Sequence, residues 1–107
     1  MKRVGFLLKV KQEKIAEYKK HHEAVWPEMQ DALRRTGWHN YTLFIRDDGQ
    51  VFGYFEAEES FEKSQDAMAN EPINTRWQEF MSPYFEGLGS AQPDEMMVEL
   101  EEYFHLD

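Results

Sequence analysis

One segment of the chain places a histidine among aromatic side chains at helical spacing. Tyr18, His22 and Trp26 recur at every fourth residue, and residues four apart share one face of a helix. That face is otherwise apolar, and a polar imidazole placed there costs free energy unless it has a partner. Because an imidazole titrates near neutral pH, His22 is a candidate acid/base residue. A core histidine bonded to a backbone carbonyl is the alternative that the pattern leaves open.

His21 points in a different direction, because one residue turns about 100° around a helix. This places it beside Glu17, and we expect it to be solvated.

Two further groups could line a binding site for a small polar molecule. His39, Asn40 and Tyr41 open an expected strand, in which His39 and Tyr41 share one face and Asn40 takes the other. Trp77 lies on the apolar face of a later helix, directly after Arg76. Sugars are held by aromatic side chains that cover their C–H faces and by polar groups that fix their hydroxyls, and the chain offers four such aromatics: Tyr18, Trp26, Tyr41 and Trp77. Core packing is the alternative for Tyr41 and Trp77, and bracing of a loop is the alternative for Asn40.

Other kinds of chemistry fit the sequence less well. The chain has no cysteine, which excludes disulfides and thiolate catalysis. Its four histidines show no metal-binding spacing, so we expect no metal site. No glycine-rich phosphate loop and no serine nucleophile motif is present.

Charge and hydropathy restrict the partners. The net charge of −9 argues against nucleic acid and anionic membranes, which bind clustered Lys and Arg. No apolar run approaches the roughly 18 residues that span a membrane. The first apolar stretch is too short for a signal peptide and is followed by Lys9, so we expect a cytoplasmic protein.

The pattern along the chain predicts a single α+β domain over residues 1–107. We expect strands at 4–10, 38–46, 50–57 and 97–104, a loop at 88–95, and helices at 12–35, after Ser60, and from Pro72. Pro27 should kink or restart the first helix, and Gly37 should end it. The order β-α-β-β-α-α-β is a ferredoxin-like split β-α-β unit with an extra helix. Its helices would cover one face of the sheet, so a homodimer packed sheet on sheet is expected.

The motif HxxxWPE, which runs from His22 to Glu28, resembles the L-rhamnose mutarotase family, together with His39-Asn40-Tyr41 and Arg76-Trp77. The resemblance extends from the first strand to the terminal EEYFHLD. It implies a dimeric α+β barrel that interconverts the anomers of L-rhamnose, or of a close deoxy-sugar, without a cofactor. It makes His22 the proton donor, and the substrate contacts that we expect are Tyr18, Trp26, Asn40, Tyr41, Trp77 and Gln78.

Two positions depart from the family pattern. Gln78 stands where the family commonly has a second tryptophan, and His105 stands where the usual ending has a tyrosine. Gln78 can bond a hydroxyl but offers no stacking surface, which affects the sugar preference more than the chemistry.

Ring opening of a sugar requires removal of a proton from the anomeric hydroxyl and delivery of a proton to the ring oxygen. One well-placed acid/base contributes about 10²–10⁴-fold to such a step. Two alternatives stay open at this point. The same scaffold hosts cofactorless or haem-dependent monooxygenases, and it could equally serve as a noncatalytic sugar-binding module.

Overall fold

A four-stranded antiparallel sheet forms one layer of the structure, a computed structural model that describes residues 1–86 and 96–107. The strands lie in the order β2-β3-β1-β4. Their bounds are Lys2–Lys9 for β1, His39–Ile45 for β2, Gln50–Ala57 for β3 and Val98–Leu100 for β4. This order confirms the split β-α-β arrangement. The loop expected at 88–95 lies outside the described residues.

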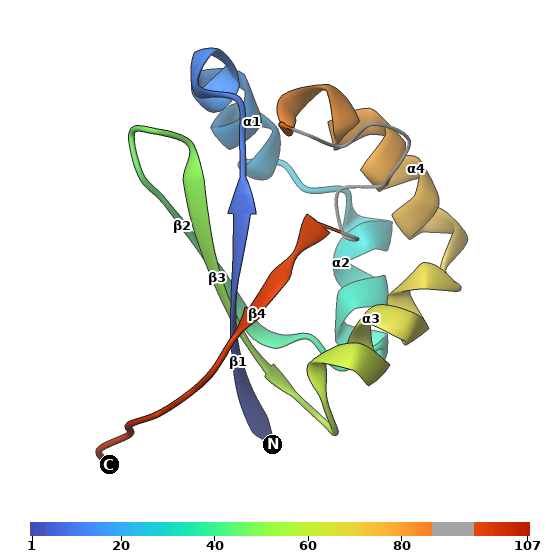
Figure 1. Cartoon of the computed structure of the whole chain (residues 1–107). Helices are drawn as coiled ribbons and strands as arrows, with labels where there is room; N and C mark the ends of the chain where they lie inside the picture. Colours follow the sequence, from blue (N-terminus) through green and yellow to red (C-terminus); the bar gives the residue numbers. More distant parts are fainter. Residues whose placement is uncertain (87–95) are drawn as a thin grey trace.

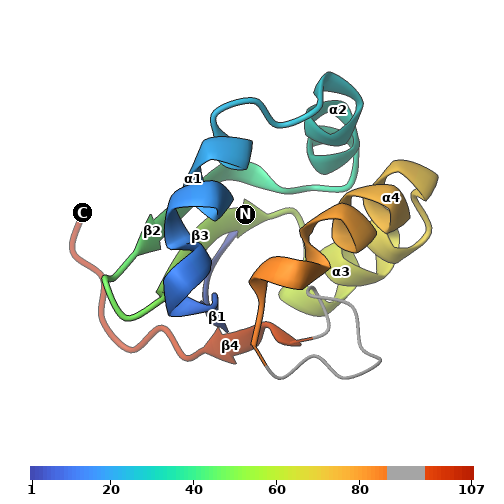
Figure 2. The ribbon, with the colours of Figure 1, turned by 90° about the horizontal axis from the view of Figure 1, so that it is seen from above.

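All the described helices pack on one face of this sheet (Figures 1 and 2). The α-helices are α1 (Ile15–His22), α2 (Pro27–Arg35), α3 (Phe61–Ala69) and α4 (Pro72–Met81). Two short 3-10 turns accompany them, η1 (Gln12–Lys14) and η2 (Ser82–Tyr84). None of the helices in the described part of the chain is long and apolar enough to cross a membrane.

The expected long helix is divided at Pro27. Its first part ends at His22, and Pro27 begins α2 as the first helical residue, where its missing N–H leaves no hydrogen bond unmade. The helix α2 ends at Arg35, and Gly37 follows with a φ of 87°, a conformation that glycine adopts without strain. His22 therefore sits at the end of a helix, directly before a turn.

Aromatic side chains fill the core between the sheet and the helices. Phe6 and Phe55 are fully buried, Phe6 stacks on Phe61, and Trp38 stacks on Phe55 with ring centroids 4.0 Å apart. The ring of Phe6 occupies the space over Gly53 in β3, where an added Cβ would lie 2.2 Å from the ring. The packing therefore requires a residue without a side chain at position 53.

The last strand is shorter than the sequence predicted. Only Val98–Leu100 pairs with β1, and the strand expected at 97–104 gives way to an exposed arm over 101–107. All three residues of β4 are exposed, so little buried apolar area favours a longer ladder. Beyond Leu100 the arm contacts β1 through a side-chain ion pair: Arg3 Nε lies 2.7 Å from the Glu102 carboxylate.

Candidate active site

A cavity of about 800 Å³ lies between the helices and the β2 side of the sheet. The end of α1 provides His22, and the other elements that wall the cavity are α2, β2, α3 and α4. Its wall combines apolar and amide side chains, including Met29, Gln30, Leu33, Trp38, Tyr41, Leu43, Gln65, Met68, Asn74, Trp77 and Gln78. This composition is typical of a pocket for a small molecule that carries hydrogen-bonding groups.

The backbone of its own helix holds the imidazole of His22. Nδ1 lies 3.0 Å from the carbonyl oxygen of Tyr18, one helical turn earlier. A carbonyl oxygen only accepts hydrogen bonds, so Nδ1 carries the proton of the neutral ring. The lone pair is consequently on Nε2, and the Tyr18 carbonyl does not occupy this nitrogen of a side chain that lines the cavity.

Burial lowers the pKa of His22 below its ordinary value, because the charged imidazolium is poorly solvated there. The hydrogen bond to the Tyr18 carbonyl acts in the opposite direction, and the neighbouring His21 lowers the pKa further. The net shift keeps the resting ring neutral at pH 7. In this state His22 can accept a proton at Nε2 and can donate that proton again afterwards.

Tyr18 lies behind the imidazole and does not line the cavity. Its ring centroid is 4.4 Å from that of His22, and it packs edge-on against Phe85 in the core. Burial raises the pKa of the Tyr18 hydroxyl, so that the phenol stays protonated. The structure thus places Tyr18 as a support for His22, whereas the sequence predicted a substrate contact.

Trp77 forms the aromatic wall beside the imidazole. Its indole lies edge-on to His22 with ring centroids 5.7 Å apart. Trp26 packs against the Trp77 indole with ring centroids 4.9 Å apart, and it also contacts Phe80. Trp77 lines the cavity although it is only 6% exposed, whereas Trp26 supports the indole from outside the cavity. Both readings of Trp77, core residue and pocket wall, therefore apply to one side chain.

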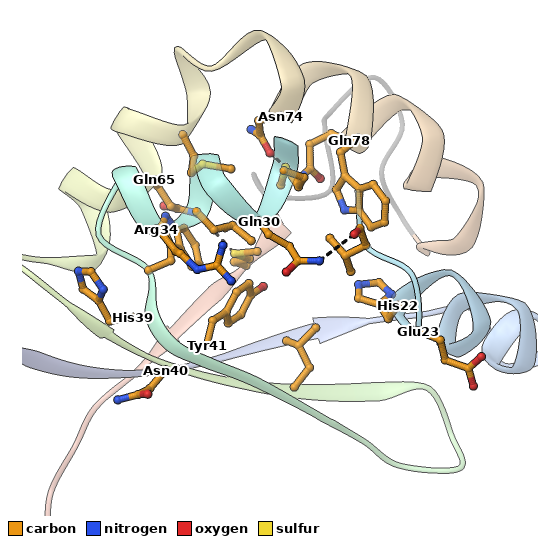
Figure 3. Close-up of a pocket in the computed structure, with 18 residues that line it drawn as sticks. His22, Glu23, Gln30, Arg34, His39, Asn40, Tyr41, Gln65, Asn74 and Gln78 are labelled. Atoms are coloured by element: carbon orange, nitrogen blue, oxygen red, sulfur yellow. Dashed lines mark hydrogen bonds between the residues drawn. The ribbon is translucent and has the colours of Figure 1, made fainter. Parts of the chain in front are cut away.

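The strand β2 sends Tyr41 into the cavity and Asn40 away from it (Figure 3). A bulge between His39 and Thr42 disturbs the register with β3, and Asn40 has a φ of 51° there. The Asn40 amide donates to Glu56 Oε1 at 2.9 Å on the uncovered face of the sheet. Asn40 is thus at the rim of the cavity, but its amide is not brought together with His22.

An amide pair on α4 completes the wall. Gln78 Nε2 donates to Asn74 Oδ1 at 2.9 Å, and Asn74 is only 4% exposed. The sequence analysis included Gln78 but missed Asn74, as well as Gln30 and Gln65. Asn74 could have been found, because it precedes Trp77 by three residues and Gln78 by four on the same helix face.

His21 and His39 are engaged elsewhere. His21 Nε2 lies 2.9 Å from the hydroxyl of Tyr84, which in turn donates to Glu17. The expectation that His21 is solvated was wrong, because α1 packs this face against η2 and the ring is partly buried. His39 Nε2 bonds Glu58 at 2.9 Å at the edge of the cavity. Among the described residues, no cluster of three or more side chains suited to a metal is present.

Comparison with known proteins gives a consistent result. A family model described as L-rhamnose mutarotase matches residues 3–106. A protein of Oceanobacillus iheyensis named L-rhamnose mutarotase is 39% identical over 108 residues, and the match covers 100% of both chains. A protein of the same name from Bacillus subtilis is 35% identical, also over 100% of both. The crystal structure of an L-rhamnose mutarotase from Formosa agariphila has the same fold, with a TM-score of 0.82 at 23% identity and full coverage of both chains.

Proposed function

The chain belongs to the L-rhamnose mutarotase family, and from this premise we propose how its residues carry out the reaction. It is an isomerase that acts on a carbohydrate and interconverts the α and β anomers of L-rhamnose. In our proposal residues 1–107 act as one mutarotase domain. His22 moves the protons, and Tyr41, Trp77 and Gln78 contact the sugar.

Ring opening begins with the neutral imidazole. Nε2 takes the proton of the anomeric hydroxyl O1, the C1–O1 bond becomes a carbonyl, and the C1–O5 bond breaks. The electron pair of that bond goes to O5, and the imidazolium returns its proton there. The open-chain aldehyde is then neutral, and His22 is in its starting state.

Ring closure repeats these steps in reverse after a rotation about C1–C2. Nε2 takes the proton from O5, O5 attacks the other face of the carbonyl, and the imidazolium protonates the new O1. No proton or electron is gained or lost over the cycle. One histidine is sufficient because O1 and O5 are bonded to the same carbon and lie within reach of a single nitrogen.

The observation that carries this proposal is the fixed tautomer of His22. The Tyr18 carbonyl holds the proton on Nδ1, and burial keeps the ring neutral, so that Nε2 offers a lone pair at neutral pH. The Trp77 indole beside it gives an apolar surface for the C–H groups of the sugar.

The direct test is saturation transfer by NMR between the α and β anomers of L-rhamnose. The purified protein should accelerate the exchange above the spontaneous rate in the same buffer. Exchange at the spontaneous rate with folded protein would refute the proposed activity.

We also propose that the chain forms a homodimer through the uncovered face of its sheet. That face carries Leu7, Phe44, Phe52, Val98 and Leu100, of which Phe44 is 59% and Phe52 40% exposed. The rings of Phe44 and Phe52 stack on each other at 6.1 Å and form a continuous apolar surface. Such a patch on a single chain is typical of an interface.

The C-terminal arm gives a second argument for the dimer. It leaves the sheet on the side away from the helices (Figure 2), and Tyr103, Phe104 and Leu106 are 91%, 73% and 80% exposed. Three large apolar side chains in water are unfavourable unless a partner covers them. In sedimentation we expect a particle near twice 12.8 kDa. The variant Phe52→Glu should sediment as a monomer, and a monomeric parent protein would refute the proposal.

A cytoplasmic location is part of the proposal as well, supported by membership of a family of carbohydrate isomerases. Cell fractionation would test it.

A further inference from the structure

The amide of Gln78 is oriented by a buried partner. Gln78 Nε2 donates to Asn74 Oδ1 at 2.9 Å, and Asn74 is held in place because it is 4% exposed. A primary amide has two N–H donors and a carbonyl acceptor. After the bond to Asn74 is made, Gln78 still has Oε1 and its second N–H, which form one flat edge with a donor beside an acceptor.

This amide pair lies on the α4 wall of the cavity, apart from the acid/base residue at the end of α1. Figure 3 shows Asn74 and Gln78 on α4 above the cavity, with His22 below them, whereas Arg34, Gln65 and His39 lie toward the other end. Along α4, Phe80 contacts His21 near α1, whereas Asn74 lies toward the start of the helix, where Glu71 pairs with Arg35 of α2. Trp77 lies between these two ends and touches the imidazole.

The proposed reaction fixes how a sugar ring must sit between these two sides. Nε2 of His22 exchanges protons with O1 and O5, so the C1–O5 edge of the ring faces His22. In a six-membered ring the opposite edge is C3–C4. The hydroxyls on C3 and C4 therefore point away from His22, and we place them against the α4 wall that contains Gln78.

We propose that Gln78, oriented by Asn74, binds the neighbouring 3- and 4-hydroxyls of the substrate and is thereby a specificity-determining residue. One hydroxyl donates to Oε1 and the other accepts from the free N–H, and this pairing suits two hydroxyls on adjacent carbons. The inference rests on the proposed function, because the reaction sets the orientation of the ring. The substrate class is a pyranose with both hydroxyls free.

The test compares two sugars on two proteins. The sugars are L-rhamnose and its 4-deoxy analogue, and the proteins are the parent and Gln78→Met, which keeps the side-chain length but has no amide. With the parent, loss of the 4-hydroxyl should raise the half-saturating concentration by about three- to tenfold, as the loss of one hydrogen bond does. With Gln78→Met, L-rhamnose loses both proposed hydrogen bonds, so its half-saturating concentration should rise by at least the same factor, and the two sugars should become equal.

Two comparisons separate recognition from a general loss of structure. The exchange rate at saturating sugar should stay within about twofold in Gln78→Met, because a contact made equally in ground and transition states affects binding alone. The variant Thr75→Val changes an exposed side chain of the same helix and should match the parent with both sugars. L-Lyxose, which lacks the methyl group but keeps the 3,4-diol, should lose the same factor as L-rhamnose in Gln78→Met.

The inference is overturned if Gln78→Met still distinguishes L-rhamnose from the 4-deoxy analogue as strongly as the parent does. Binding measured by quenching of tryptophan fluorescence gives this comparison without any turnover. A protein that binds L-rhamnose through Gln78 but does not exchange its anomers would refute the proposed mutarotation alone. Exchange without discrimination at the 4-hydroxyl would refute the role of Gln78 alone.

Discussion

Replacement of His22 by asparagine is the most direct test of the proton-transfer mechanism. Asn keeps a donor that can reach the Tyr18 carbonyl, which His22 Nδ1 contacts at 3.0 Å, so α1 should retain its last turn. It removes the nitrogen that takes and returns protons. General acid–base catalysis contributes about 10²–10⁴-fold, which corresponds to about 3–5 kcal/mol of activation free energy. We expect His22→Asn to slow anomer exchange by at least about 10²-fold.

The pH dependence of the parent protein gives a second readout of the same mechanism. The proposed mechanism requires the base form of His22, and burial holds the pKa of the ring below its ordinary value of about 6.5. Activity should therefore remain full as pH falls to about 6.5 and decline only at lower pH. A decline centred above that value would contradict a neutral, buried imidazole as the base.

The matched control is His21→Asn. It removes the contact between the ring and the Tyr84 hydroxyl and should cost about 1 kcal/mol of stability, the usual worth of one hydrogen bond. Anomer exchange should stay within a few-fold of the parent, because His21 does not line the cavity. Saturation transfer on L-rhamnose measures both variants after circular dichroism confirms that they are folded. Full activity of His22→Asn, or an equal loss in both variants, would refute the reasoning.

Three further outcomes follow from the packing and the pKa shift. Trp77→Ala should lower the free energy of unfolding by about 3 kcal/mol or more, because the indole is only 6% exposed. Trp77→Phe should stay folded and raise the half-saturating sugar concentration. Unchanged saturation in Trp77→Phe would show that the indole is not part of the site. Gly53→Ala should lower the free energy of unfolding in urea by about 1–3 kcal/mol, because the Cβ of the alanine would lie 2.2 Å from the Phe6 ring. An unfolding midpoint equal to that of the parent would contradict this packing. The parent should lose stability as pH falls from about 6.5 toward the lower pKa of folded His22, because the unfolded chain takes up the proton first. The unfolding free energy of His22→Asn should lack this contribution over the same pH range. An equal pH dependence in both proteins would assign the effect to another group.

The sequence predicted the helical part of the site well, because a helix has a regular period. The steps from Tyr18 to His22 placed the imidazole on the inward face, and the 100° offset placed His21 elsewhere. Pro27 marked the break before α2 for a local reason, the absence of its N–H. These features depend only on neighbouring residues, so they can be derived without knowledge of the tertiary fold.

The sequence pattern could not predict which inward-facing side chains line the cavity and which pack against other side chains. The sequence pattern gave Tyr18, His22 and Trp26 one helical phase, but α1 ends at His22 and Trp26 lies before α2. Of the three, only His22 lines the cavity, because Phe85 packs against the Tyr18 ring and Phe80 against the Trp26 ring. Periodicity tells which face is inward, but not whether a side chain meets a cavity or another side chain. The end of β4 was also overestimated, since its length depends on burial that this edge of the sheet does not provide.

Asn40 shows how two lines of sequence reasoning can diverge. Strand alternation placed it on the face opposite Tyr41, whereas we also expected it among the substrate contacts. In this chain the alternation holds despite the bulge, and the amide bonds Glu56 on the uncovered face of the sheet.

In the proposed mechanism α1 supplies proton transfer and α4 supplies recognition of the sugar. The proton-transfer unit is local, because the residue that fixes the tautomer of His22 lies one turn earlier in the same helix. The proposed recognition unit is on α4, where Asn74 bonds the Gln78 amide within another single helix. A substitution at position 78 can therefore change which hydroxyls are bound while leaving the tautomer and the burial of His22 intact. Specificity can then change without loss of the proton-transfer chemistry.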